Sequence, residues 1–153
     1  MPSVAEQITA TLVELNTQGR ALGAVERVLL ESEADARASD ERLSSDRGRG
    51  PLEGLPFAVK ANIDIAGVAT TSGLAIDDLA PAGTNAWAVH LLRQAGAIPV
   101  ATTTMAPMAI GAITEHPTLG PCRNPRDLAR QSGGSSGGSG AVVGAGLVPF
   151  ALG

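Results

Sequence analysis

The chain has 153 residues, of which 44% are hydrophobic and 2% aromatic, and its formal net charge is −4. That hydrophobic fraction is enough for a packed core and excludes wholesale disorder. The acidic balance and the scarcity of aromatic side chains argue against a nucleic-acid partner. One cysteine and two histidines exclude an internal disulfide and a Cys/His structural zinc site.

The sequence also lacks the segments that direct a protein into or across a membrane. No apolar run approaches the ~18 residues that a membrane-spanning helix needs. The first residues have neither the basic start nor the apolar stretch of a secretory signal. We therefore expect a cytoplasmic protein with no membrane partner.

Residues 1–47 predict an N-terminal pair of helices. Gly19 follows the first run as a stop signal. A second run over residues 22–43 is rich in helix formers and has a polar face that should be solvated. Turn-forming residues over 44–51 end this run. The apolar residues of the first run recur at helical spacing: Val4, Ile8, Leu12 and Leu15.

After Pro51 the pattern changes to short apolar runs that glycine and proline separate. Residues 55–59 predict a buried strand, and residues 86–95 predict a helix that Gly96 closes. A second buried strand is expected over residues 97–101. This alternation of strand and helix predicts a layered α/β domain.

A glycine- and serine-rich segment covers residues 131–140, and small apolar residues follow over 141–148. Such a segment could form a flexible linker, a phosphate-binding loop, or a tight loop that enters a helix and approaches a ligand closely. The phosphate loop lacks support, because no Lys-Ser or Lys-Thr follows the glycines and G-x-G-x-x-G does not occur. The apolar run disfavours the linker, so we favour the tight loop.

The single lysine is the compositional feature that suggests chemistry. Eleven residues are lysine or arginine, and all of them except Lys60 are arginine. Lys60 ends an apolar run, and a buried lysine can lose its proton whereas an arginine cannot. The alternative is chance in an arginine-biased chain. Together with the serines of 132–139, Lys60 could form a Ser/Lys acyl-transfer site. No Asp–His pair is evident from the positions of His90 and His116.

Several motifs occur in a characteristic order, and they cover about residues 48–153: 50–60, 62–64, 96–100, 120–125 and 132–139. With these motifs the chain resembles the N-terminal part of an amidase signature enzyme. The resemblance implies hydrolysis or transfer of amides by a serine nucleophile, a second serine in a cis peptide, and a lysine. It also implies a mixed β-sheet layered between helices, and it requires no metal or cofactor.

The resemblance assigns roles to particular residues. Lys60 matches the family's general acid/base, and Ser135 matches the bridging cis serine, for which the alternative role is capping the next helix. Ser136 and Ser139 are expected to serve as such capping hydroxyls. Four positions match a loop that lines the acyl pocket in relatives: Met108, Ala109, Ile110 and Gly111. The alternative is that these four residues only fill the core.

The chain departs from the family pattern in three places. Ala61 stands where many relatives have aspartate, and residues 102–104 are all threonine where relatives have Lys-Thr-Asn. In relatives the nucleophilic serine follows shortly after the position of Gly153. We therefore expect an N-terminal helical segment over 1–47 and an amidase domain over 48–153 that is truncated before the nucleophile. On this expectation the chain alone is inactive.

The sequence leaves the function open between two classes. The first is a hydrolase fragment whose full-length form, which could be a homodimer, cleaves the C–N bond of a small-molecule amide. Three kinds of reaction stay open: hydrolysis of urea-derived carboxamides, hydrolysis of aryl or aliphatic amides, and glutaminyl-tRNA formation together with a partner subunit. The second class is a non-catalytic half-domain or degenerate remnant that acts only in binding or assembly.

Overall fold

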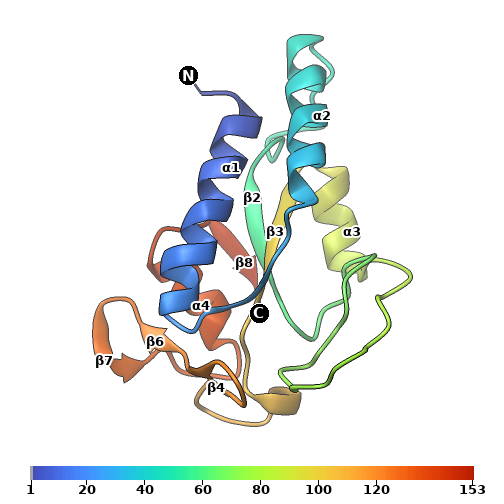
Figure 1. Ribbon diagram of the computed structural model, residues 1–153. Helices are drawn as coiled ribbons and strands as arrows, with labels where there is room; N and C mark the ends of the chain where they lie inside the picture. Colours follow the sequence, from blue (N-terminus) through green and yellow to red (C-terminus); the bar gives the residue numbers. More distant parts are fainter. Residues whose placement is uncertain (1) are drawn as a thin grey trace.

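A four-stranded sheet forms the centre of the structure, a computed structural model that describes residues 2–153 (Figure 1). β1 pairs antiparallel with β3, whereas β2 lies parallel to both β3 and β8. The sheet is therefore mixed, which confirms the predicted α/β class, and the predicted strands 55–59 and 97–101 are its two inner strands. The strands follow the order β1–β3–β2–β8: Val25–Val28, Ile98–Thr103, Pro56–Lys60 and Phe150–Leu152.

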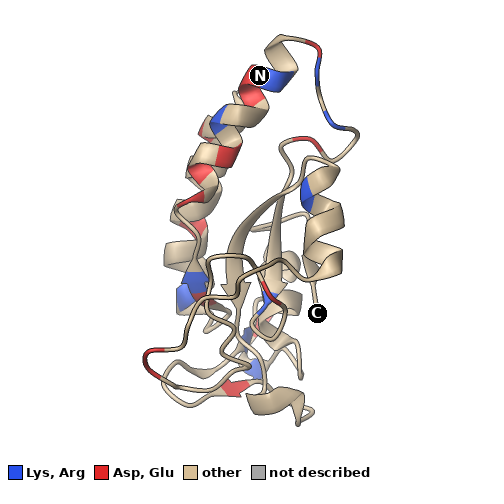
Figure 2. Cartoon of the chain, turned by 90° about the vertical axis from the view of Figure 1, so that its right-hand side faces the viewer, with Lys and Arg blue, Asp and Glu red and all other residues tan. Residues whose placement is uncertain are grey.

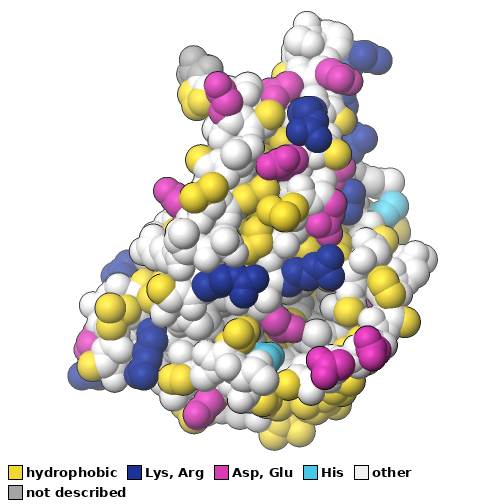
Figure 3. Space-filling view, in the orientation of Figure 1, with side chains coloured by type: hydrophobic (Ala, Val, Ile, Leu, Met, Phe, Trp, Pro, Cys, Tyr) yellow, Lys and Arg dark blue, Asp and Glu magenta, His cyan; other side chains and the backbone are white. Residues whose placement is uncertain are grey.

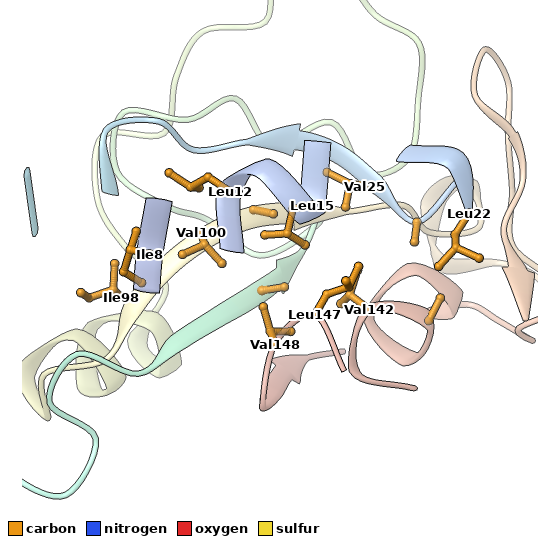
Figure 4. Close-up of a cluster of buried hydrophobic side chains, with 14 of the residues drawn as sticks. Ile8, Leu12, Leu15, Leu22, Val25, Ile98, Val100, Val142, Leu147 and Val148 are labelled. Atoms are coloured by element: carbon orange, nitrogen blue, oxygen red, sulfur yellow. The ribbon is translucent and has the colours of Figure 1, made fainter. Parts of the chain in front are cut away.

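Helices cover both faces of this sheet. α1 (Val4–Glu14) and α4 (Gly137–Gly144) pack on one face, and α3 (Trp87–Gln94) packs on the other. Each buried large aliphatic side chain contributes about 1.5–3 kcal/mol, so these two clusters hold the layers together. Figure 4 shows the first cluster, in which side chains of α1, β3 and α4 meet: Ile8, Leu12, Val100 and Val142 among them.

The predicted helix over 22–43 is wrong in its first part. Its residues Val25–Val28 form the edge strand β1, and the helix α2 spans only Ser32–Ser44. Val25 pairs with Thr103 of β3 and buries its side chain in the core. A β-branched residue suits this half-buried edge position, and the tertiary pairing overrides the helix propensity of the run. Figure 2 shows that charged residues lie along α2, whereas the strands are mostly uncharged.

The start of α1 is held by side chains from two helices. Ser3 and Glu6 form a reciprocal capping box at the N-cap. Asp40 of α2 accepts hydrogen bonds from the Val4 and Ala5 amides at 2.8 and 3.0 Å. These acceptors satisfy amides that have no partner within the helix, and the Asp40 charge suits the positive end of the helix dipole. The cap thus fixes α1 and α2 relative to each other.

Short elements carry the chain between these layers. α1 continues as the π-helical turn η1, which ends at the predicted stop, Gly19. Between β3 and α4, a 3₁₀ turn and two small hairpins lead to the glycine–serine loop. The short elements are η1 (Leu15–Gly19), η2 (Pro107–Ala109), β4 (Glu115–His116), β5 (Gly120–Pro121), β6 (Arg123–Asn124) and β7 (Asp127–Gln131).

Gly138 allows α4 to approach the main chain of two other segments. A Cβ atom at this position would lie 2.5 Å from the carbonyl oxygens of Ala24 and Thr104, whereas a Cβ on Gly140 would contact nothing within 4 Å. We expect Gly138→Ala to lower the free energy of unfolding by about 2 kcal/mol. Gly140→Ala should instead raise it, by up to ~1 kcal/mol. Urea denaturation measures both, and equal effects would contradict the close approach.

Hydrophobic side chains also reach the surface. Figure 3 shows them between α1 and α2 and at the lower edge around η2. Met108 and Ile110, at this lower edge, are exposed, as are Val13 and Leu30 near α1 and α2. Within residues 2–153, none of the helices combines the length and the apolar character that a bilayer crossing requires.

Candidate active site

Lys60 and two serines meet at the end of the central strand β2. The Lys60 Nζ donates hydrogen bonds to the Ser135 Oγ at 2.9 Å and to the Ser136 Oγ at 2.7 Å. The serines are more than 70 residues away in sequence, with separations of 75 and 76. The fold therefore brings together both residues that the resemblance assigned to catalysis, and it adds a third.

The sheet positions Lys60. It is the last residue of β2, pairs with Thr103 of β3, and is only 7% exposed. Among the described residues, no carboxylate forms an ion pair with it. A buried amine is costly without polar partners, so the two serine hydroxyls satisfy a group that would otherwise be isolated.

The glycine–serine loop positions the two serines immediately before α4. The Ser135 carbonyl accepts a hydrogen bond from the Ala106 amide at 2.9 Å, and the peptide bond that joins Gly134 to Ser135 is cis. The tight loop expected from the sequence is thus present, and it leads directly into a glycine-rich helix, α4.

The capping roles expected for Ser136 and Ser139 are wrong. Ser136 stands at the N-cap of α4, but its hydroxyl makes no capping bond and contacts Lys60 instead. The Ser139 hydroxyl bonds to the Thr103 hydroxyl at 2.7 Å and donates to the Leu152 carbonyl at 2.8 Å. Ser139 therefore connects α4 to β3 and β8, and its β3 partner, Thr103, is the residue that pairs with Lys60.

The threonines that replace the family's Lys-Thr-Asn are buried and bonded. Thr103 bonds to Ser139, as above, and the Thr104 hydroxyl donates to the Gly23 carbonyl at 2.7 Å. Ala61, which replaces an aspartate, is buried, and its carbonyl accepts the Ser72 amide. With these residues in place of the family's usual ones, Lys60 still donates hydrogen bonds to Ser135 and Ser136.

The segment predicted to line an acyl pocket begins next to Ser135. Ala106, whose amide holds the Ser135 carbonyl, directly precedes η2. Of the four residues, Met108 and Ala109 have positive φ angles, and Met108 and Ile110 expose 59% and 83% of their surface. They are not core residues, which excludes the alternative of small core packing for these side chains. Their role in substrate binding stays a prediction.

Sequence reasoning missed a carboxyl group and an imidazole that lie near each other, those of the half-buried Glu26 and the buried His116. Burial raises the pKa of Glu26, and the Thr71 hydroxyl and the nearby His116 ring lower it in part. The His116 Nδ1 accepts hydrogen bonds from the Thr118 and Leu119 amides at 3.3 Å. Its Nε2 and the Glu26 Oε2 are buried with no protein partner. No periodicity in the sequence indicated this pair, because its two members belong to separate segments.

The single cysteine, Cys122, contacts the start of the glycine–serine loop at Ser132. Burial raises the pKa of the Cys122 thiol, although hydrogen bonds with Ser132 and Thr104 lower it in part. The Ser132 hydroxyl lies 3.1 Å from its Sγ. Within the described part of the chain, no three His, Cys, Asp or Glu side chains are grouped as metal ligands would be.

Comparison with known proteins places the chain in a family. The sequence model of the amidase family matches residues 6–153. The chain belongs to the amidase signature family. Relatives of this family act on C–N bonds of amides, so the general chemistry of the chain's relatives is amide hydrolysis or transfer.

Two curated relatives illustrate the range of the family. One is a subunit of the glutamyl-tRNA(Gln) amidotransferase of Treponema pallidum, to which the chain is 54% identical over 105 residues, or 67% of the chain and 20% of the relative. The other is a 1-carboxybiuret hydrolase subunit of Pseudomonas sp. (strain ADP), with 46% identity over 123 residues, or 77% of the chain and 27% of the relative. Both relatives are subunits by name.

Solved amidase structures share the fold of the chain. A protein from a vestigial complex related to the origins of an s-triazine catabolic enzyme superposes with a TM-score of 0.94 at 39% identity, over 99% of the chain and 34% of that protein. The peptide amidase of Stenotrophomonas maltophilia superposes with a TM-score of 0.87 at 29% identity, over 98% of the chain and 32% of the amidase. The chain thus spans about a third of these structures.

Proposed function

We propose that the chain provides the general acid/base part of an amidase site that hydrolyses the C–N bond of a small-molecule carboxamide. The observation that carries this proposal is the hydrogen bond between the Lys60 Nζ and the Ser135 Oγ at 2.9 Å. A net charge of −4 gives no support to a tRNA substrate, so we favour a small amide.

Ser136 gives the lysine a defined orientation in this proposal. In its neutral form, the Lys60 amine has two N–H donors and one lone pair. One N–H donates to the Ser136 Oγ at 2.7 Å, and a rotation of the amine then turns the lone pair toward the Ser135 Oγ. Lys60 can accept the Ser135 proton in this orientation while Ser136 holds the amine in place.

The nucleophile in this scheme is a serine that follows residue 153 in the complete enzyme. Residue 153 lies against the cluster: a Cβ built on Gly153 would be 3.0 Å from the Ser136 Cβ and 3.2 Å from its Oγ. β8 pairs with β2 and leads to this residue. A chain that continues from here passes close to Ser135, which is where a serine nucleophile would need its base.

The proposed reaction then has two stages. The nucleophilic serine gives its proton to Ser135 as Ser135 passes its own to Lys60, and the new alkoxide attacks the amide carbonyl. Backbone N–H groups stabilise the oxyanion, the C–N bond breaks, and the amine leaves with the proton returned along the relay. Water repeats the sequence on the acyl-enzyme, which releases the carboxylic acid and restores the serine. No step requires a metal or cofactor.

The two serines can be separated by mutation in a completed enzyme, in which the C-terminal part of the Pseudomonas relative continues residues 1–153. We expect Ser135→Ala to lower kcat for carboxamide hydrolysis by about a hundredfold, because the relay is broken. Ser136→Ala should lower it by about tenfold, because the amine loses only an orienting bond. Steady-state rates of amine release measure both effects.

Ser45→Ala is the control, since its hydroxyl is exposed and bonds only to the Glu41 carbonyl and the Arg47 side chain among the described residues, both outside the site. Hydrolysis that persists at the unmodified rate in Ser135→Ala would contradict the proposed relay. A larger loss in Ser136→Ala than in Ser135→Ala would instead assign the bridging role to Ser136.

A further inference from the structure

Thr114 contacts the glycine–serine loop at Ser135 and at Gly137. Its Oγ1 accepts a hydrogen bond from the Gly137 amide at 2.9 Å and donates to the Ser135 carbonyl at 3.4 Å. Thr114 is fully buried, so water does not compete for these bonds. Because the Ala106 amide also donates to the Ser135 carbonyl, two separate segments hold the main chain of this serine.

The main chain around Thr114 fits the loop without free space. A Cβ on Gly134 would lie 2.7 Å from the carbonyl carbon and oxygen of Ile113, and a Cβ on Gly137 would lie 2.5 Å from the Thr114 Oγ1. The two glycines therefore permit a close approach that a side chain would block. Residues 113–114 thus support the loop immediately before and after the two serines.

This support is itself anchored by backbone hydrogen bonds. The Thr114 carbonyl accepts the Cys122 amide at 2.9 Å, and the Cys122 carbonyl accepts the Ser132 amide at 3.0 Å. Ser132 is also the residue at which the loop begins. The loop and its support are therefore joined through Cys122, and a movement of Thr114 would be transmitted to Ser135 through short and direct contacts.

We propose that Thr114 is a positioning residue for the Lys60–Ser135 relay. This inference rests on the proposed function. The first amides of a helix have no acceptor within the helix, and the Gly137 amide obtains one only from Thr114 among the described side chains. By holding this amide and the Ser135 carbonyl together, the hydroxyl keeps the Ser135 Oγ within hydrogen-bond distance of Lys60.

The single lysine makes this proposal testable without an activity assay. Incorporation of lysine labelled with ¹⁵N at Nζ gives one side-chain NMR signal in the 153-residue chain, that of Lys60. We expect Thr114→Val to shift this signal, and Thr114→Ser, which keeps the hydroxyl, to restore it. Ser32→Ala is the control, since it removes another buried hydroxyl bond, to the Leu29 carbonyl at 2.6 Å, and this hydroxyl bonds to none of the residues around Lys60.

Thr114→Val and Ser32→Ala should each lower the folding equilibrium constant by about tenfold, since each removes a buried hydrogen bond. Only Thr114→Val should change the Lys60 signal. An unchanged Lys60 signal in Thr114→Val, or an equal change in Ser32→Ala, would overturn the positioning role.

Hydrogen exchange decides the question if Thr114→Val does not fold. The Gly137 amide of the unmodified chain should exchange at least about tenfold more slowly than in an unstructured peptide, because Thr114 accepts its proton. Exchange at the unprotected rate would contradict the proposal. A completed enzyme that hydrolyses no amide would overturn the proposed function, yet it would leave these NMR and exchange results unchanged, so the two failures are distinguishable.

Discussion

Replacing Lys60 by arginine in the completed enzyme should lower kcat/KM for carboxamide hydrolysis by about a thousandfold. An arginine side chain keeps its proton inside a protein and therefore cannot act as the base that receives the Ser135 proton. Its planar guanidinium is also larger than the ammonium group that fits between Ser135 and Ser136. In the proposed relay Lys60 acts as a neutral amine, and an arginine with its fixed charge cannot take that form.

Arg130→Lys is the matched control, because it exchanges the same two residue types at an exposed position. The Arg130 side chain is 79% exposed and pairs only with Asp127, and such surface pairs contribute little to stability. We expect its activity to equal that of the unmodified enzyme. Activity near this level in Lys60→Arg at neutral pH would exclude Lys60 as the base.

Neutralising Glu53 should destabilise the protein by about 3 kcal/mol at neutral pH. Burial alone would raise the pKa of Glu53, but hydrogen bonds from Arg42, Ser39 and the Arg49 amide, with the Arg42 charge, lower the pKa from 4.5 to about 2. Its side chain is only 3% exposed, and the Arg42 Nη2 lies 2.7 Å from its Oε1. The network joins α2 to the segment before β2.

The sign of the pH dependence follows from this lowered pKa. The unfolded state binds the proton more readily, so the stabilisation is present above about pH 4.5 and is lost as the pH falls toward 2. In Glu53→Gln the corresponding part of the acid dependence should be absent. Urea unfolding of both proteins across this range measures the difference between their free energies of unfolding.

Asp127→Asn provides the comparison for this experiment, because Asp127 is half-exposed and pairs with an arginine on its own strand. It should change the free energy of unfolding by less than about 1 kcal/mol. If the difference between the unmodified protein and Glu53→Gln stays constant from neutral pH to acid, the stabilising network around Glu53 is refuted.

Local patterns predicted the two inner strands of the sheet and the helices α1 and α3. The strands at 55–59 and 97–101 and the helix at 86–95 were readable because each buries an apolar face, and α1 was readable from its helical spacing. β1 could not be predicted in this way, because it is a short edge strand in a run of good helix formers. Its pairing with β3, far along the chain, decides its conformation.

The residues of the candidate site also divide into those that the sequence indicates and those that only the structure reveals. Lys60 stands out as a single lysine in an apolar run, and Ser135 stands out through a glycine-flanked motif, so both could be named from the sequence. Nothing local distinguishes Ser136 from a capping serine, and Thr114 belongs to a segment with no functional signal. Their roles depend on contacts with partners 76 and 23 residues away.

By itself, the sequence determined the family and the α/β class, and it indicated the lysine and the serine of the proposed relay, because motifs and hydrophobic spacing are local properties. The tertiary structure decided that these two residues meet and that Ser136 also accepts a hydrogen bond from the lysine. It also decided that Thr114 contacts the loop that carries both serines. A hydrogen bond forms over about 3 Å, and only the packing of β2, β3 and α4 brings side chains from these distant segments within that range.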